Sequence, residues 1–515
     1  MASAVSPDAS SPALTPRAAA HWLAALCGIE PEHFTYRDET RDPTRHGLRS
    51  LFDRCRFADI GGEAPAGVAA FTTEDLKAYR SGAWGDHLRD FHAAYLAGGK
   101  RRLHSPLHGG MVRVLGEVML DASQVYLALH EGELCFFVFV GRIPQAVYYP
   151  ARDLFLVLHA FPLNHPDRLM RLLKLLLGHP LPFARFLARA LRGELRPAFV
   201  LGDARPGHFV KESLGYLDWA EAEVAAFLAR DGLLALVTDW CAMDPLDLFP
   251  ALHRADILMV NSARAGLRFL EMGIDAHRVI RTKGRNGSGW LRRRVGLDVA
   301  SPGAAPRDPA RFRVMISLDA ERQRILNQVE AFRFVLRRLG TACAAAGLAL
   351  EVVWDGWTMS HVPNEKDRVV LARIEALVAK ITDGAGVTIA AQHRVFGRSF
   401  TGKLPEIAPC DLVLVTQGTG ALMPSWLLER PTIVYHAAQH VKNRIDLADH
   451  GVFQLDQRAI LEEPPTVPPQ GPRFAIALWG LDDALVRAAG DRLGLVPELP
   501  VPEPRTPDHA NGTID

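Results

Sequence analysis

Three features are scarce in this 515-residue chain: paired cysteines, long apolar runs and an excess of charge of one sign. Its six cysteines lie far apart and form no C-x-x-C pair, which favours reduced thiols in the cytoplasm over a disulfide or zinc framework. No apolar run approaches the roughly 20 residues of a membrane-spanning helix. The formal net charge is +1, so no overall field recruits nucleic acid. We expect a cytoplasmic protein that binds no nucleic acid.

The N-terminal third is compositionally distinct from the rest. Residues 1–20 lack a basic stretch followed by an apolar run, and we expect a disordered leader there rather than a signal peptide. Residues 21–195 begin with polar, helix-like sequence. They continue with "MVRVLGEVML" and "QVYLALHEGELCFFVFVG", whose β-branched and aromatic residues predict antiparallel strands. This part is therefore predicted to be an N-terminal α+β extension.

From residue 196 onward, short apolar runs alternate with helical segments, as in "PAFVLGD", "LLALVTD" and "DILMVNS". Such alternation predicts an α/β fold with parallel strands and helices on their faces. A stretch rich in proline, glycine and alanine follows near residue 300, and the alternation restarts at "RVMISLD". We predict one domain over 196–300, a second over 311–485, and a helix end with a loose tail over 486–515.

Ligands of open α/β sheets bind beyond the carboxyl ends of the strands. The residues that follow the predicted strands are rich in charge, which suits a ligand site, although polar loops are common there in any α/β protein. The set comprises Asp203, Arg205, His208, Lys211, Glu212, Asp239, Asp244, Ser317, Asp319, Arg322, Arg324, Trp354, Asp355, Trp357, His361 and Gln417–Gly420.

The stretch "QGTG" separates a strand from a helical segment. Its glycines let the backbone approach a ligand closely, and free N–H groups of the following helix suit a phosphate. The other interpretation is a tight turn that requires positive φ. It is not the dinucleotide motif G-x-G-x-x-G, because Met423 occupies the position of the third glycine.

In "GDARPGHF", His208 has the chemistry of a proton-transfer group, and Asp203 is a candidate to orient it. The alternative is a histidine bonded to the local backbone at a helix start. Arg322, predicted near the start of a long helix, suggests an anionic partner or a solvated helix face. Trp357 either stacks on a base or sugar ring or covers the core.

Three apparent motifs fail on inspection. "GRSFTGKL" has Leu404 in place of the magnesium-binding hydroxyl of a P-loop, although Lys403 could still contact a phosphate. "HAAQH" lacks the glutamate of a zinc-protease motif. The basic loop 281–294 is more simply a solvated loop than a nucleic-acid contact. We predict no metal site.

Basic residues recur at helical spacing over 168–192, between leucines and phenylalanines. A helix of this kind can lie on anionic lipid, which would place the protein at the cytoplasmic face of the inner membrane. It can equally pack its leucines on the core and leave its arginines in water.

The layout after residue 196 resembles a bacterial-type GT-B glycosyltransferase. The resemblance rests on the linker near 300, "RVMISLDAERQR" and "DLVLVTQGTGALMPSWLLERPTIVY". It implies two Rossmann-like domains facing a cleft, with no metal and no cofactor beyond the nucleotide-sugar co-substrate. On the donor side it implies Gly418, Thr419 and Gly420 at the diphosphate, with Arg322, Lys403, Asp319 and Trp357 nearby. On the acceptor side it implies His208 or Asp203 as the base, with Arg205, Lys211 and Asp239.

Two departures leave alternatives open. Many GT-B enzymes hold the donor ribose with a glutamate at the position of Pro424, and often carry glycine at that of Glu429. The resemblance implies transfer of a sugar from a nucleotide-sugar to a carbohydrate, lipid-linked or protein acceptor. The alternatives are a nucleotide-sugar epimerase of the same fold and a non-catalytic carbohydrate- or assembly-binding protein.

Overall fold

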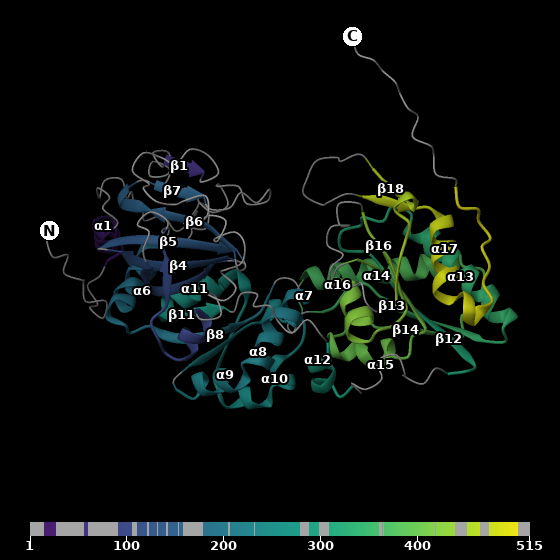
Figure 1. Ribbon diagram of the computed structural model, residues 1–515, viewed down its shortest axis with the longest axis horizontal. Coiled ribbons are helices and arrows are strands. Elements are labelled where there is room, and N and C mark those ends of the chain that lie inside the picture. Colours follow the sequence, from purple (N-terminus) through teal and green to yellow (C-terminus); the bar gives the residue numbers. More distant parts are fainter. Residues whose placement is uncertain are drawn as a thin grey trace, which may run out of the picture. The chain divides into compact units, whose positions relative to one another are not determined.

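The chain forms two compact units, Met1–Asn286 and Gly287–Asp515. Both contain parallel strands and helices, so the fold is α/β, as the alternation predicted (Figure 1). The predicted division at residue 195 runs through the first unit. The computed structural model describes residues 15–26, 56–59, 91–105, 111–120, 123–130, 132–140, 143–152, 154–157, 179–203, 206–230, 232–278, 288–297, 308–359, 363, 365–417, 419–437, 451–463 and 473–502.

A seven-stranded sheet occupies the first part of the first unit, in the order β1-β7-β6-β5-β4-β3-β2. Neighbouring strands are antiparallel, as predicted, except that β1 and β7 pair in parallel. One face packs on helices α1 (Pro16–Leu26) and α6 (Pro180–Arg192). The strands are β1 (Arg56–Asp59), β2 (Arg102–His104), β3 (Met111–Leu120), β4 (Ser123–His130), β5 (Glu133–Val140), β6 (Ile143–Tyr149) and β7 (Leu154–Val157).

The same unit contains a four-stranded parallel sheet in the order β10-β9-β8-β11. Counted along the chain this is third, second, first, fourth, so the order reverses between β8 and β11. Strand β3 of the antiparallel sheet packs against β11 and α11. The strands are β8 (Arg196–Leu201), β9 (Leu233–Val237), β10 (Asp256–Val260) and β11 (Ile274–Arg278), the last of which the sequence did not predict.

Helices connect these strands. After β8 come three consecutive helical segments: α7 (Pro206–His208), a π-helix (Phe209–Leu214) and α8 (Gly215–Trp219). The other helices that the structure describes in this unit are α9 (Glu221–Leu228), α10 (Pro245–Leu248), α11 (Ser262–Met272) and short 3₁₀ turns at Pro150–Arg152, Thr238–Trp240 and Pro250–Arg254.

The second unit is built on a six-stranded parallel sheet in the order β14-β13-β12-β15-β16-β17. Along the chain this is third, second, first, fourth, fifth, sixth, so the order reverses between β12 and β15. A separate antiparallel pair is formed by β18 and β19. The strands are β12 (Arg311–Ser317), β13 (Ala349–Asp355), β14 (Ala391–Arg394), β15 (Leu412–Thr416), β16 (Thr432–Tyr435), β17 (Val452–Gln454), β18 (Ile460–Glu462) and β19 (Phe474–Ile476).

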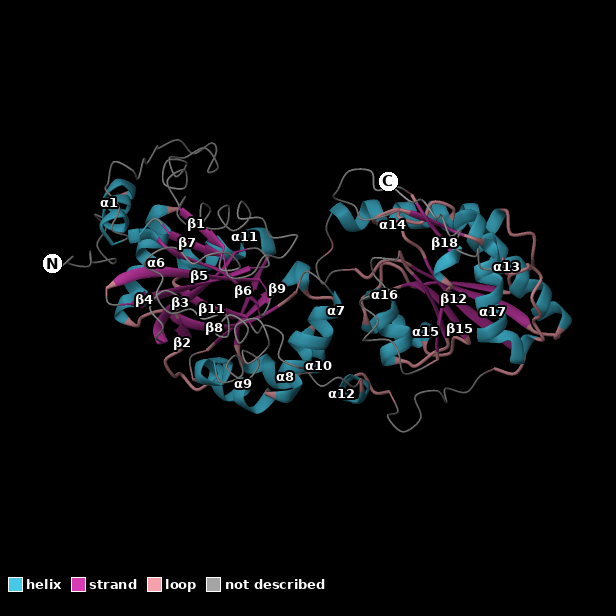
Figure 2. Ribbon diagram, turned by 45° about the horizontal axis from the view of Figure 1, so that its top comes forward, coloured by secondary structure: helices cyan, strands magenta, loops and turns pink. Residues whose placement is uncertain are grey.

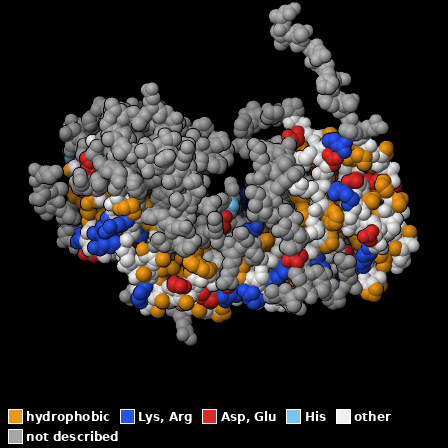
Figure 3. Space-filling model, in the orientation of Figure 1, with side chains coloured by type: hydrophobic (Ala, Val, Ile, Leu, Met, Phe, Trp, Pro, Cys, Tyr) orange, Lys and Arg blue, Asp and Glu red, His pale blue; other side chains and the backbone are white. Residues whose placement is uncertain are grey.

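Helices cover both faces of this sheet. Figure 2 shows α13 and α17 on one side of the strands and α15 and α16 on the other. On the face of the unit seen in Figure 3, charges of both signs are interspersed with apolar side chains. The helices are α12 (Gly289–Arg294), α13 (Gln328–Ala345), α14 (Glu365–Asp383), α15 (Leu404–Ile407), α16 (Thr419–Ala421), α17 (Leu478–Leu493), a π-helix (Leu422–Leu427) and 3₁₀ turns at Thr401–Lys403 and Gln457–Ala459.

Several sequence-based expectations need correction. Helix α1 begins at Pro16, inside the predicted leader, of which residues 1–14 lie outside the described residues. Helix α13 begins at Gln328, so Arg322 lies in a loop and not in a helix. The tail that was expected to be loose is tied down at its start, because Asp482 accepts the backbone N–H groups of Glu498 (2.6 Å) and Leu499 (2.8 Å).

Helix α6 forms the second half of the basic stretch 168–192, for which lipid contact and core packing were the two interpretations. Its Phe183, Phe186 and Leu187 are fully buried in the core beneath the antiparallel sheet, while Arg189 reaches the carbonyl of Met272 at 3.0 Å. The apolar face of α6 therefore packs on the core; residues 168–178 of the same stretch lie outside the described part of the chain. Within the described ranges, none of the helices has the length and apolarity needed to cross a membrane.

Candidate functional site

The predicted glycine turn lies where the chain order of the second sheet reverses. Gly418 is outside the described residues, Thr419 begins α16, and Gly420 lies over the ends of both strands at the reversal. A Cβ atom on Gly420 would lie 2.9 Å from Cγ2 of Val415 and 4.0 Å from Oγ of Ser317. A side chain at Gly420 would therefore crowd Val415 of β15, whereas the separation from Ser317 of β12 is an ordinary contact. In open α/β sheets such a reversal is where ligands bind.

The loop that follows β12, one of the two strands at this reversal, carries two arginines. The Asp319 carboxylate accepts the backbone N–H groups of Arg322 (3.3 Å) and Arg324 (2.8 Å), so Asp319 shapes the loop. Gln323 has a φ of 50°, which is uncommon for a residue with a side chain. Burial and the neighbouring charge of Arg322 lower the pKa of Arg324. An anion would relieve this repulsion.

Lys403 and Trp357 have structural partners, contrary to their predicted place at a diphosphate. Nζ of Lys403 is buried and donates to Asp355 (2.6 Å), to the carbonyl of Trp357 (2.9 Å) and to Thr358 (2.9 Å). These bonds use all three donors of the ammonium. The indole N–H of Trp357 donates to Asp367 at 2.6 Å, and Trp354 is buried in the core. Both tryptophans follow the core-covering interpretation.

In the first unit, Asp203 and Arg278 meet where the order of the four-stranded sheet reverses. Arg278 ends β11 and donates to the carbonyl of Gly202 (3.0 Å) and to the carboxylate of Asp203 (2.5 Å). Its guanidinium lies 5.1 Å from the ring centroid of Trp240. Gly202 has a φ of 146°, and a Cβ there would lie 2.9 Å from Val237, so the position requires glycine.

His208 is oriented by a different carboxylate from the predicted one. Its Nδ1 lies 2.7 Å from Oε1 of Glu212, one helical turn on, whereas Asp203 pairs with Arg278. Both His208 and Glu212 are partly exposed. His208 ends α7, and Lys211 and Glu212 lie on the π-helix that follows it. π-Helices are rare and occur often at functional sites. Arg205 lies outside the described residues.

Asp239, predicted on the acceptor side, caps a helix. Its carboxylate accepts the backbone N–H of Ser262 at 2.8 Å and also pairs with the Ser262 hydroxyl. Ser262 opens α11, so this carboxylate already satisfies the helix terminus.

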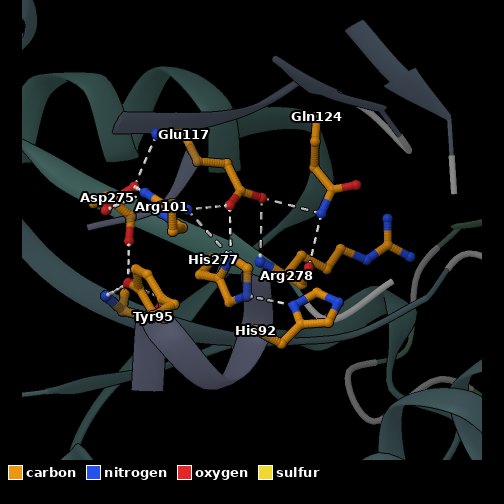
Figure 4. Close-up of polar contacts among 9 residues, drawn as sticks. His92, Tyr95, Arg101, Glu117, Gln124, Asp275, His277 and Arg278 are labelled. Carbon is orange, nitrogen blue, oxygen red and sulfur yellow. Dashed lines mark hydrogen bonds and ion pairs between the residues drawn. The ribbon is translucent and has the colours of Figure 1, made fainter. Parts of the chain in front are cut away.

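A buried polar network lies between the antiparallel sheet and β11 (Figure 4). Arg101 donates to Glu117 at 2.9 Å and to both oxygens of Asp275 at 2.7 and 2.6 Å. Glu117 also lies 2.7 Å from Nδ1 of His277, whose Nε2 lies 2.7 Å from Nδ1 of His92. We call these five residues the buried network. Removal of one charge from such a group leaves another uncompensated.

Burial perturbs the titration of the buried network. Burial raises the pKa of Glu117 to about 7, although the positive charge of Arg101 lowers it. Burial, followed by the charge of Arg101, lowers the pKa of His277 well below its usual value. Burial also disfavours the charge of Arg101, but Asp275 and Glu117 outweigh it and raise its pKa.

Sequence reasoning missed both the buried network and Arg278. The available signal was a glutamate inside the largely apolar strand sequence "MVRVLGEVML". The network reaches the reversal point of the first sheet, because the backbone N–H of Arg278 donates to Glu117 at 3.3 Å and the Arg278 side chain holds Asp203.

The two reversal points thus offer different chemistry. The first unit has a His–carboxylate pair suited to proton transfer. The second has a glycine turn and two arginines in the loop after β12, which suit an anion. Among the described residues, no group of three or more His, Cys, Asp or Glu side chains is arranged to hold a metal ion. No protein-family model and no curated protein matches the chain.

Proposed function

We propose that the protein is a GT-B type glycosyltransferase that moves a sugar from a nucleotide-sugar to a carbohydrate, lipid-linked or protein acceptor. The observation that carries the proposal is the glycine turn at the reversal point between β12 and β15. The strand order of that sheet is the one found in Rossmann folds, where nucleotides bind across the reversal point.

The first unit supports the same assignment. Its four parallel strands follow the order of the first four strands of a Rossmann sheet. One Rossmann-like sheet in each unit is what the GT-B resemblance implies. The antiparallel sheet of the first unit is an addition to that pattern.

The donor diphosphate would rest against the backbone at Gly420, close to Arg322 and Arg324. Backbone N–H groups and fixed cations at such a site stabilise the negative charge that grows on the leaving diphosphate. The Arg322 side chain is 58 % exposed and lies 3.7 Å from Glu321, a separation at which an exposed pair gains little. Its charge is therefore available to a ligand.

The acceptor hydroxyl would lose its proton to His208. Glu212 orients the imidazole through Nδ1 and stabilises the imidazolium that forms. Asp203 is a weaker candidate for the base because Arg278 neutralises it. The structure thus gives the two residues predicted as alternative bases different partners.

The proposal is tested by calorimetric titration of the full chain with UDP, GDP, ADP, CMP and dTDP. We expect one nucleotide to bind and the Gly420→Ala variant to bind it at least 10-fold more weakly, because the new methyl group collides with Val415. Gly490→Ala is the matched control. A Cβ at that position of α17 makes only ordinary contacts, the nearest at 3.5 Å.

A chain that binds none of the five nucleotides would overturn the proposal and favour a non-catalytic role. If one nucleotide binds, its sugar conjugate should release the nucleotide only when an acceptor is present. Interconversion of the sugar without an acceptor would instead identify an epimerase.

A further inference from the structure

One buried ring nitrogen of His436 has no hydrogen-bond partner among the residues that the structure describes. The residue follows β16, and 3 % of it is exposed. Its Nδ1 lies 2.9 Å from the carbonyl oxygen of Ala437, and because a carbonyl only accepts, Nδ1 carries the proton. Nε2 is buried and has no hydrogen-bond partner within the part of the chain that the structure describes. A buried polar atom in this state is uncommon and needs an explanation.

Strand register places His436 beside the glycine turn. Thr416 pairs with Tyr435, and the backbone N–H of Gln417 donates to the Tyr435 carbonyl at 3.0 Å. Side chains alternate between the faces of a sheet, so His436 belongs to the face opposite Tyr435. That is the face of Val415, over which Gly420 lies.

The chemistry of Nε2 selects the ligand group. With its proton held on Nδ1, the neutral imidazole offers a lone pair at Nε2, which accepts a hydrogen bond from a hydroxyl group. The ribose-binding glutamate implied by the GT-B resemblance is absent. Its position is taken by Pro424, which is buried within the π-helix Leu422–Leu427 and cannot bind a hydroxyl. A hydroxyl acceptor is therefore needed elsewhere on this edge.

We propose that Nε2 of His436 accepts a hydrogen bond from a sugar hydroxyl of a nucleotide ligand at the β12–β15 reversal point. This inference rests on the proposed function, because it assumes that a nucleotide binds there. The hydroxyl belongs either to the ribose or to the sugar that is transferred. Both are the same chemistry, and the ligands of the test separate them.

The test uses two substitutions that each keep one nitrogen position of the ring. His436→Asn retains a donor near Nδ1 and removes Nε2, whereas the longer side chain of His436→Gln retains a polar group near Nε2. Calorimetry compares both variants with the wild type for the tightest of UDP, GDP, ADP, CMP and dTDP. The same titrations are run with its 2′-deoxy and 3′-deoxy forms, where these differ from it, and with its glucose or mannose conjugate. Melting temperatures establish that both variants fold.

We expect His436→Asn to lose about 5- to 10-fold in affinity for the hydroxyl-bearing ligand and His436→Gln to recover part of it. A loss that disappears with a deoxynucleotide identifies the ribose. A loss seen only with the sugar conjugate identifies the transferred sugar. Equal affinity of His436→Asn and wild type for every ligand, or an equal loss on all of them, overturns the inference while leaving nucleotide binding intact. A wild type that binds no nucleotide overturns both proposals.

Discussion

The carboxylate of Glu117 on β3 lies 2.7 Å from Nδ1 of His277 on β11, and this contact joins the antiparallel sheet to the parallel sheet of the first unit. Both side chains are completely buried. The backbone N–H of Glu117 donates to Asp275 at 2.8 Å, so main chain and side chain bind the same neighbouring strand. The two sheets are therefore held in register by polar contacts as well as by apolar packing.

Replacement of Arg101 should destabilise the first unit strongly. Arg101→Met leaves Glu117 and Asp275 without their shared cation in a buried setting, for a loss of about 3–5 kcal/mol in the free energy of unfolding. Urea denaturation measures this loss. Arg196→Met is the matched control, because the Arg196–Asp256 pair is largely exposed and its loss should cost less than ~1 kcal/mol. Equal losses in the two variants would contradict a stabilising role for the buried network.

Glu117 should make the stability of the first unit depend on pH. Burial raises its pKa from 4.5 to about 7, so between these values the folded state binds more protons than the unfolded state. The stability contributed by Glu117 is therefore full below about pH 4.5 and is lost as the pH rises through about 7. His277 acts in the opposite direction because its pKa is lowered. The stability that it contributes is lost as the pH falls below 6.5.

Comparison of the wild type with Glu117→Gln isolates the pH-dependent stability that Glu117 contributes, because the amide does not titrate. Between pH 4.5 and 7.5 the wild type should lose on the order of 3 kcal/mol in unfolding free energy relative to the variant. The measurement is urea denaturation of both proteins at half-unit pH intervals. A difference that stays constant across this range would show that Glu117 titrates normally.

Lys403 should matter for stability and not for nucleotide binding. Lys403→Met leaves the buried Asp355 without its cation, for a loss of roughly 3 kcal/mol. If a nucleotide binds at the Gly420 turn, its affinity should change less than 2-fold, because Lys403 donates all its protons to protein atoms. A large loss of affinity in a variant of wild-type stability would instead support the hypothesis, drawn from "GRSFTGKL", that Lys403 contacts a phosphate.

Periodicity predicted much of the fold because strand and helix signals are local. The runs that became β8, β9, β12, β13 and β15 are rich in apolar residues, and each was identified. Strand β11, "IDAHR", was missed because Asp275, His277 and Arg278 make it polar. These side chains are buried by partners far away in the chain, and such pairing has no signature in the strand itself.

In the candidate site, too, local signals were predictable and partners distant in the chain were not. The ends of the strands could be located from the sequence, but the strand order that sets the reversal points and the partner of each polar side chain could not. Asp203 and His208 are close in sequence, yet Asp203 binds Arg278, 75 residues away, and His208 binds Glu212. Choice among nearby carboxylates depends on helix pitch and sheet order, which composition does not specify.

Under the proposed function, Glu212 and Asp203 should differ in their effect on turnover. Glu212→Gln removes the charge that stabilises the His208 imidazolium and should lower kcat about 100-fold at unchanged donor KM. Asp203→Asn should mainly lower stability, because it removes the carboxylate charge that Arg278 binds. Glu223→Gln on the exposed side of α9 is the control. Nucleotide release in the presence of acceptor measures the rates; an unchanged kcat for Glu212→Gln would remove the pair from the mechanism.

Arg292 should hold the helix that follows the glycine turn. It is buried in α12, and its Nε–H donates to the carbonyl of Leu427 at 2.6 Å while Nη2 pairs with Glu429, which has a φ of 50°. Both contacts are made where the π-helix ends. Arg292→Met should cost about 3 kcal/mol and speed amide exchange across residues 422–427.

Arg293, its exposed neighbour, provides the control, and Arg293→Met should change stability by less than ~0.5 kcal/mol. Because removal of both charged partners leaves no buried charge unpaired, Arg292→Met/Glu429→Leu should be less destabilised than Arg292→Met alone. If the single and double variants lose the same stability, the ion pair does not secure the π-helix.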